Sequence, residues 1–262
     1  MKHVEYKGKR YNVLDGKLDL SNLGISNINN ILGLENLINL KELDLSNNTI
    51  TEIEGLETLT HLELLNLRVN QIKEIKGLEE LTNLKYLYLY NNRIYEISGL
   101  EALVNVVELN LFDNQIHKIK GLENLINLKK LYLSSNRIAV IEGLENLIYL
   151  KFLNIEKNFV TELQGLNTLE NLILLAIKRN NIKEIKSLEH LTQLKRLELA
   201  FNEITEIMGL AELENLETID LRGNPVYDNE LEFATKKIKV KLLDAKELVF
   251  YCKWFNRVCE NI

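Results

Sequence analysis

One feature constrains this chain more than any other: an asparagine returns every 22 residues from Asn48 to Asn224 without a slip. An unbroken internal repeat indicates a solenoid, because each unit must stack on its neighbours to bury an apolar face that it cannot bury alone. The period covers most of the 262 residues, so we expect one continuous domain. The asparagines are Asn48, Asn70, Asn92, Asn114, Asn136, Asn158, Asn180, Asn202 and Asn224.

Each part of the unit, L-x-x-L-x-L-x-x-N-x-I-x-x-I-x-G-L-E-x-L-x-N, has a physical reason. The L-x-L core alternates with period two, which predicts a short strand with one buried face. The asparagine side chain can bond backbone groups where the strand turns, and stacked units would align these amides in a ladder. Glycine, replaced once by Ser187, permits a bend into the opposite wall. The G-L-E-x-L stretch suits a single helical or 3₁₀ turn.

These features predict an α/β solenoid that is curved, with a concave parallel β-sheet and a convex side of short helical or 3₁₀ turns. The unit resembles the leucine-rich repeat over nearly the whole chain. Its 22-residue version, as in "NLKKLYLSSNRIAVIEGLENL" at 127–147, resembles the protein phosphatase 1 regulatory-subunit type. That resemblance implies a non-enzymatic scaffold that binds a partner protein on its concave face. It also implies a regulatory role, with a phosphatase catalytic subunit as one possible partner.

One alternative interpretation of the repeat stays open. Internalins have similar 22-residue units but usually carry proline where this chain has glycine, so the alternative is an internalin-type surface recognition or adhesion module. The phosphatase-regulator family alternates acidic and aromatic residues along neighbouring repeats, and Glu42, Leu64, Tyr86 and Glu108 repeat that pattern only in part.

The ends of the repeat predict caps on a single domain, 1–262. Residues 1–17 form an N-terminal cap with the hairpin-like "VEYKGKRYNVL", residues 18–224 hold about ten repeats, and residues 225–262 form a C-terminal cap with a helix. Leu23 takes the asparagine position of an atypical first repeat, and Asp228 is suited to cap a short helix. One face of the tail helix is expected to pack on the last repeat through Leu248, Cys252, Phe255, Cys259 and Ile262.

The composition indicates which ligands and which cellular compartment to expect. The net charge of −6 disfavours a nucleic-acid-binding domain, although it leaves room for a local basic patch. The chain has no apolar run of the kind found in a signal peptide or membrane span. The two cysteines, Cys252 and Cys259, are seven residues apart on an expected helix, about 10 Å along its axis and too far for a disulfide. We therefore expect a cytoplasmic monomer that does not bind a membrane.

Strand residues between the leucines should point out of the concave face, so the sequence gives the columns of that surface directly. They predict an aromatic and apolar patch that spans about 20 Å across five strands, a footprint suited to a protein partner. The opposing interpretation is that aromatic residues merely stabilise the sheet as cross-strand neighbours. With Arg196 added from the basic region, the expected partner-binding residues are Leu64, Tyr86, Tyr88, Tyr90, Phe112, Tyr132, Phe152 and Arg196.

A second set of side chains makes the C-terminal half of the concavity locally basic, diluted by Glu156, Glu198 and Asp220. We interpret it as a mixed-charge solvated face. The competing hypothesis is nucleic-acid binding, which would weaken steeply with salt. The basic residues are Lys130, Lys157, Lys178, Arg179, Arg196 and Arg222.

Catalysis and cofactor binding have no support in the pattern. The four histidines, His3, His61, His117 and His190, are scattered, and none shares a metal-ligand spacing with the cysteines. Serine, histidine and acidic residues do not converge as a nucleophilic site requires. The glycines follow the repeat and do not form a phosphate-binding loop. We expect no enzyme activity, no cofactor and no metal.

Overall fold

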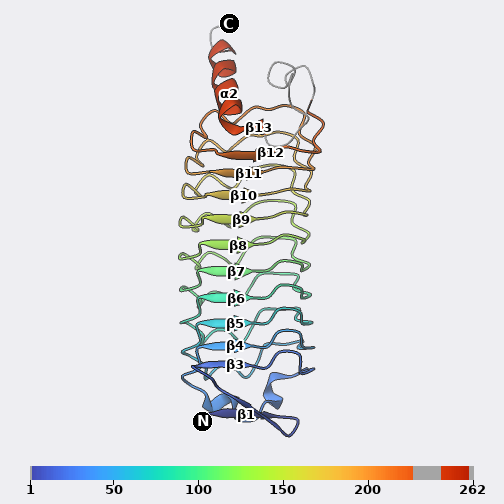
Figure 1. Cartoon of the computed structure of the whole chain (residues 1–262), viewed down its shortest axis with the longest axis vertical. Helices are drawn as coiled ribbons and strands as arrows, with labels where there is room; N and C mark the ends of the chain where they lie inside the picture. Colours follow the sequence, from blue (N-terminus) through green and yellow to red (C-terminus); the bar gives the residue numbers. More distant parts are fainter. Residues whose placement is uncertain (1, 227–242, 260–262) are drawn as a thin grey trace.

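The chain forms an elongated solenoid whose strands stack one above another along its long axis (Figure 1). The computed structural model describes residues 2–226 and 243–259. Within 243–259, side chains are described only for residues 245–250 and 252–253. The main sheet has 11 strands in the order β13 to β3, parallel except for β13. The predicted fold class, a solenoid with a parallel sheet, is confirmed. The strands are β3 (Lys17–Asp19), β4 (Glu42–Asp44), β5 (Leu64–Asn66), β6 (Tyr86–Tyr88), β7 (Glu108–Asn110), β8 (Lys130–Tyr132), β9 (Phe152–Asn154), β10 (Leu174–Ala176), β11 (Arg196–Glu198), β12 (Thr218–Asp220) and β13 (Leu243–Asp244).

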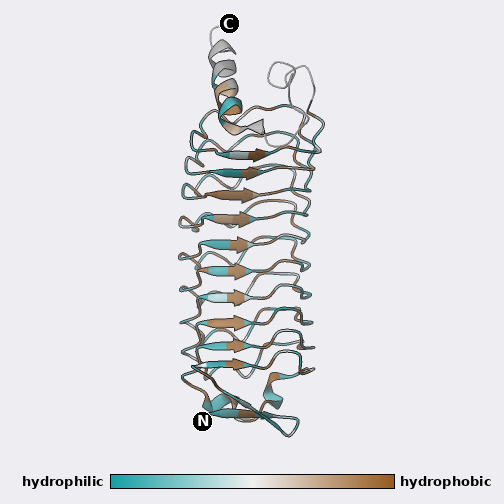
Figure 2. Ribbon diagram, viewed as in Figure 1, coloured by the Kyte–Doolittle hydropathy of each residue, from teal (hydrophilic) through white to brown (hydrophobic). Residues whose placement is uncertain are grey.

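The repeated leucines form the core because every strand pairs with the next at a shift of one whole unit. Leu87 lies between Leu65 and Leu109, and all three are fully buried. Burial of one leucine side chain contributes about 2 kcal/mol, so a column of them strongly favours this register. Figure 2 shows the result as brown and teal alternating along each coil.

The asparagines do form a ladder, and its rungs run through the backbone of the preceding unit. The Asn136 side-chain nitrogen donates to the Leu133 carbonyl in its own unit and to the Leu111 carbonyl one unit earlier, both at 3.0 Å. Its oxygen accepts from the Ile116 N–H at 3.0 Å. Each side chain thus bonds two units together and satisfies buried groups that the short strands leave without partners. The same pattern recurs at Asn70, Asn92, Asn114, Asn158, Asn180, Asn202 and Asn224.

A second and exposed ladder uses the last asparagine of the unit. The Asn127 side chain donates to the Val104 carbonyl at 3.0 Å, and Asn105 donates to the Thr82 carbonyl at 2.9 Å. Tyr149 takes the corresponding position one unit after Asn127, next to exposed Ile148. This ladder makes one bond per unit where the buried ladder makes three or more, so it contributes less to unit stacking.

The convex side differs in detail from the expected helical turns. Among the described residues, 3₁₀ helices occur only at η1 (Ile28–Asn30) and η2 (Leu34–Asn36). In later units the stretch is a pair of successive turns, as where the Leu59 N–H donates to the Leu56 carbonyl at 2.9 Å. The glycine before it packs tightly: a Cβ on Gly143 would lie 2.5 Å from the Ile119 carbonyl oxygen. Close stacking of the units therefore favours glycine at this position, where Ser187 is the one exception among the units described.

The N-terminal residues form the expected hairpin. Strands β1 (His3–Tyr6) and β2 (Lys9–Asn12) pair antiparallel. Val4 and Tyr6 are buried in the same core as the first repeats. The Glu5 and Leu32 backbones exchange two hydrogen bonds of 2.9 Å, which fixes the hairpin to the first unit. The hairpin therefore shields the end of the leucine core from water.

At the other end, β13 pairs antiparallel with β12, and helix α2 (Ala245–Cys259) follows. Leu248 and Cys252 are buried, as expected for two members of the helix face. The Cys252 thiol lies 3.4 Å from the Ile207 carbonyl oxygen. The side chains of Phe255 and Cys259, together with Ile262 and the expected cap at Asp228, lie outside the described residues. In the part of the chain that is described, no helix has the length and apolar character needed to cross a bilayer.

Candidate protein-binding face

The strands present the predicted columns on the face of the sheet that points away from the core, which we call the sheet face. Tyr86 lies beside Leu64 in register, and Tyr88 lies between Asn66 and Asn110. Tyr86 is 37% exposed, whereas Leu64 and Tyr88 are half-buried. We define the aromatic patch as a group of side chains on strands β5, β6 and β8 and two residues after the ends of β6 and β7: Leu64, Tyr86, Tyr88, Tyr90, Phe112 and Tyr132.

Asparagines alternate with tyrosines along the middle of the patch. The Asn110 oxygen accepts a hydrogen bond from the Phe112 N–H at 3.0 Å, so this side chain folds back onto its own strand. Asn66 does the same with the Arg68 N–H at 3.3 Å. The rings of Tyr88 and Tyr132 therefore stand among shorter side chains that are occupied with the backbone.

The hydroxyls of Tyr88 and Tyr132 remain neutral donors. Burial, helped by the charge of Glu108, raises the pKa of Tyr88 to about 12. Burial is also the main reason why the pKa of Tyr132 is raised, and Glu108 again contributes. The hydroxyls of Tyr86, Tyr88 and Tyr132 form no hydrogen bond within the described residues. An amphipathic ring with an available hydroxyl is well suited to a protein interface.

Arg68 belongs to this site, although the sequence pattern did not single it out. Its guanidinium donates to the Tyr90 hydroxyl at 2.8 Å and lies 5.7 Å from the centre of the Tyr90 ring. The contact holds the Tyr90 ring across one edge of the patch. The sequence could have identified Arg68 through its place in the repeat, because Arg68 holds the position of Tyr90 in the preceding unit and therefore lies directly beside it.

Two expected members lie apart from the aromatic patch. Phe152 is separated from Tyr86 in its column by Glu108 and Lys130, which form an ion pair of 3.1 Å. Phe152 lies beside half-buried Leu174, an apolar neighbour that was not among the expected site residues. Arg196 is further along, on β11, and pairs with Glu198 at 3.1 Å. The structure therefore groups Arg196 with charged residues and not with the tyrosines.

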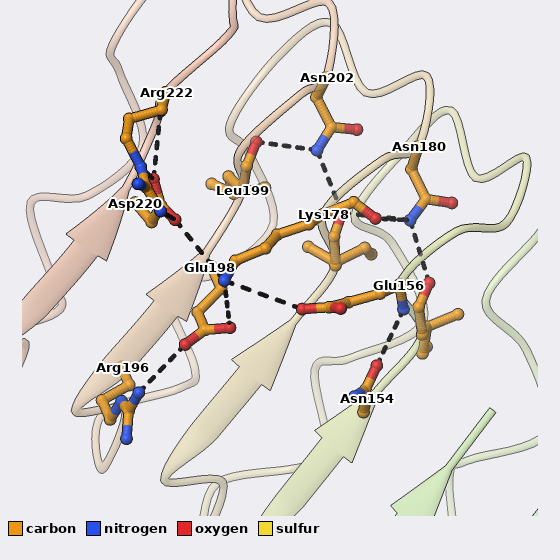
Figure 3. Close-up of polar contacts among 12 residues, drawn as sticks. Asn154, Glu156, Lys178, Asn180, Arg196, Glu198, Leu199, Asn202, Asp220 and Arg222 are labelled. Atoms are coloured by element: carbon orange, nitrogen blue, oxygen red, sulfur yellow. Dashed lines mark hydrogen bonds and ion pairs between the residues drawn. The ribbon is translucent and has the colours of Figure 1, made fainter. Parts of the chain in front are cut away.

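Lys178 is the centre of that charged group (Figure 3). Its ammonium lies 2.8 Å from Glu198, 3.6 Å from Asp220 and 4.0 Å from Glu156. Asp220 also accepts two hydrogen bonds from the Arg222 guanidinium, at 2.7 and 2.8 Å. Three carboxylates and three cations, with Arg196 as the third, are therefore balanced within the network.

The environment shifts the ionisation of this network. Burial raises the pKa of Glu156, and the charge of Lys178 opposes that shift. Burial lowers the pKa of Lys178, but the hydrogen bond and charge of Glu198 outweigh it and the net shift is upward. The Arg222 hydrogen bond lowers the pKa of Asp220. The shifts of Lys178, Asp220 and Arg222 therefore favour their charged forms, whereas the raised pKa of Glu156 favours its protonated form.

The predicted basic region thus divides into two kinds of residue. Four of its members are in ion pairs, so the interpretation of a mixed-charge face is confirmed for them: Lys130, Lys178, Arg196 and Arg222. Lys157 and Arg179 are different. They are exposed at the turn after the strand, and neither forms an ion pair with any residue that the structure describes.

The residues that the structure describes contain no candidate metal site. Groups of three histidine, cysteine or acidic side chains that could hold a metal ion do not occur among residues 2–226 and 243–253. His61 lies on the outer wall, where its Nδ1 is 3.0 Å from the Ile38 carbonyl oxygen.

Comparisons with known proteins agree with this architecture. A family model described as leucine-rich repeats (2 copies) matches residues 38–80, 82–124 and 126–168. The crystal structure of internalin C2 from Listeria monocytogenes str. 4b F2365 is 33% identical, has a TM-score of 0.68, and covers 76% of this chain and 88% of that chain. The chain belongs to the leucine-rich repeat family.

A second solved structure shares the fold of this leucine-rich repeat protein. It is the functional domain of InlJ from Listeria monocytogenes, which includes a cysteine ladder. Identity is 21% and the TM-score 0.54, with 79% of this chain and 53% of that chain covered. No curated protein sequence matches. The repeat class and the internalin-like neighbours are thus established, whereas the resemblance to phosphatase regulatory subunits stays a prediction.

Proposed function

We propose that this leucine-rich repeat protein is a scaffold that binds a partner protein on the sheet face, centred on the aromatic patch, and acts by binding rather than catalysis. Proteins with such repeats commonly present their sheet as an extended binding surface. The patch combines apolar area with hydroxyl groups that have no described hydrogen-bond partner. Tyrosine-rich surfaces of this kind are enriched in the residues that dominate interface energies.

The observation that carries the proposal is the set of neighbours around Tyr88. If aromatic residues were present only to stabilise the sheet, they should pair with aromatic or β-branched residues on adjacent strands. Tyr88 instead lies in register with Asn66 and Asn110, whose side chains are occupied with their own backbone or with neighbouring polar groups. Its ring contributes little to strand pairing and is available to a partner.

Two more specific functions are supported by different observations: regulation of a phosphatase, and recognition at a cell surface. The resemblance of residues 127–147 to phosphatase regulatory subunits makes a phosphatase catalytic subunit the first partner to test. Internalin-type surface recognition is the second candidate, and the 33% identity with internalin C2 favours it. A cytoplasmic location and a monomeric state are part of the first proposal. Cell fractionation with an antibody to the native protein separates the two, because the second requires the protein outside the cell.

The test is affinity capture from native lysate with the purified wild-type protein and the double variant Tyr88→Ala and Phe112→Ala. Loss of two central aromatic side chains should weaken a true partner by about tenfold or more. The matched control removes two exposed aromatic residues away from the sheet face, Tyr95→Ala and Tyr149→Ala. Partners that bind the patch variant as well as wild type, with the recovered set unchanged, would overturn the proposal.

Direct binding to a recombinant phosphatase catalytic subunit, measured by calorimetry, tests the finer assignment on its own. Saturable binding that the patch variant loses supports a regulatory role. No binding removes the phosphatase partner and leaves the scaffold proposal to the capture experiment.

A further inference from the structure

The turn that follows each strand holds one residue in the left-handed backbone region, and its identity changes along the solenoid. The φ angles at Asn47, Asn91 and Asp113 are 54°, 55° and 52°. Asparagine and aspartate tolerate this conformation because their short side chains can bond the local backbone. In three successive later units the same position is Lys157, Arg179 and Phe201, with φ of 52°, 56° and 58°.

Long, branched and aromatic side chains are all unfavourable in this backbone region. Val69 is a single earlier case, with φ of 54°, whereas Lys157, Arg179 and Phe201 occupy three neighbouring units. Contacts within the solenoid account for little of this arrangement. Phe201 packs over Gly223, where an added Cβ would lie 2.5 Å from the ring, and the Arg179 guanidinium lies 5.0 Å from the ring centre. Phe201 is nevertheless 51% exposed, and Lys157 and Arg179 are exposed too.

Two further exposed residues adjoin these three. The Phe159 N–H donates to the Ile138 carbonyl at 2.8 Å, which places Phe159 beside Arg137 of the preceding unit. Phe159 is 55% exposed. Together they form what we call the rim patch: Arg137, Lys157, Phe159, Arg179 and Phe201.

The rim patch carries three cations on the surface of an acidic protein. None of its three cations forms an ion pair with a described residue, in contrast to the cations around Lys178, while the whole chain carries a net charge of −6. The nearest acidic residues in the same two columns are Asp113 and Glu203, each two units from the patch member in its column. Positive charge with two exposed phenylalanines complements a ligand that is both anionic and apolar.

We infer that the rim patch is a second docking surface, distinct from the aromatic patch, which binds an acidic protein segment that carries aliphatic or aromatic side chains. A short segment needs only the three cations and two rings. A nucleic acid or an anionic membrane would extend beyond them and meet Asp113, Glu203 and the overall negative charge, which disfavours both. The exposed rings also match an apolar side chain better than a phosphate backbone.

The experiment measures fluorescence anisotropy of a labelled peptide of about twelve residues in which glutamates alternate with leucine or phenylalanine. Its matched control peptide has glutamine in place of every glutamate. The variant is Lys157→Asn, Arg179→Asn and Phe201→Asn, because asparagine suits the left-handed backbone and should hold or raise the Tm. The control protein Val69→Asn makes the same exchange in an early unit outside the patch, where φ is 54°.

We expect the acidic peptide to bind wild type and Val69→Asn equally and the triple variant at least about tenfold more weakly. The affinity should fall with salt, and the variant Tyr88→Ala with Phe112→Ala should bind normally because it alters the other surface. Equal affinity for the triple variant overturns the inference, as does equal binding of the glutamine peptide. Tighter, patch-dependent binding of an oligo(dT) strand or of phosphatidylserine vesicles overturns it in favour of those ligands.

Discussion

The substitution Asn136→Ala removes one rung of the buried ladder and tests whether these side chains hold the units together. Asn136 is 7% exposed, and its amide links Leu111, Ile116 and Leu133 through three hydrogen bonds of 3.0 Å. Alanine leaves the Ile116 N–H and two carbonyl groups in the interior without these partners. Water cannot replace them easily, because the surrounding leucines and isoleucines are fully buried.

The expected cost is about 4 kcal/mol. Three net hydrogen bonds contribute about 1 kcal/mol each, and the orphaned buried N–H adds at least about 1 kcal/mol of desolvation. The exposed ladder provides a matched control: Asn127→Ala deletes one hydrogen bond of 3.0 Å to the Val104 carbonyl at the surface. Its cost should stay near 0.5 kcal/mol.

Urea unfolding followed by circular dichroism measures both variants, with the slope of the transition checked for a change in cooperativity. A broken rung in the middle of a one-dimensional stack can uncouple the two halves, which would appear as a shallower or biphasic transition. A loss for Asn136→Ala no greater than for Asn127→Ala would show that the buried ladder is not needed for stacking.

Three more perturbations follow from the geometry. Ser187 has φ of 61° at the glycine position, so Ser187→Gly should raise the Tm by about 2 °C in a thermal scan, and a fall would contradict this. Burial raises the pKa of Tyr88 from 10.0 to about 12; its stabilising contribution is therefore complete below pH 10 and is lost as pH rises toward 12. In titration at 295 nm, wild type and Tyr88→Phe should coincide up to about pH 11, and an earlier difference would refute the shift. Lys178→Met removes the cation that three carboxylates share, so it should lower the free energy of unfolding by about 2 kcal/mol at pH 7 and by less below pH 4. The control variant Lys195→Met breaks an exposed ion pair and should lower it by less than about 0.5 kcal/mol. Equal losses for the two lysine variants in urea unfolding would count against the network.

The repeat predicts the fold well because its signals are local and periodic. Leucines at period two and an asparagine every 22 residues leave one register in which all of them are buried together. The columns of the sheet face follow from the same alternation, so the positions of Tyr86 and Tyr88 could be read from the chain. The convex turns were less certain, because one short G-L-E-x-L stretch satisfies either a 3₁₀ turn or two successive turns.

Charge pairing was not predictable in the same way. The sequence placed Lys157, Lys178, Arg179 and Arg196 in one basic region because all lie on neighbouring units. Long side chains choose their partners by direction and distance across units, which a column does not specify. The structure turns Lys178 and Arg196 toward carboxylates and leaves Lys157 and Arg179 exposed.

The periodic pattern of leucines and asparagines is enough to specify the solenoid, its strand register and the residues of the sheet face, because only this register buries all the leucines together. The pairing of polar groups, in contrast, depends on how neighbouring units pack in three dimensions. The packing of the units brings the asparagine amides to the backbone of the preceding unit and the Arg68 guanidinium to Tyr90. It also places Lys178 among carboxylates, whereas the cations of the rim patch form no ion pair with a described residue. These pairings depend on distances of a few ångströms between units, and no residue pattern within one unit encodes them.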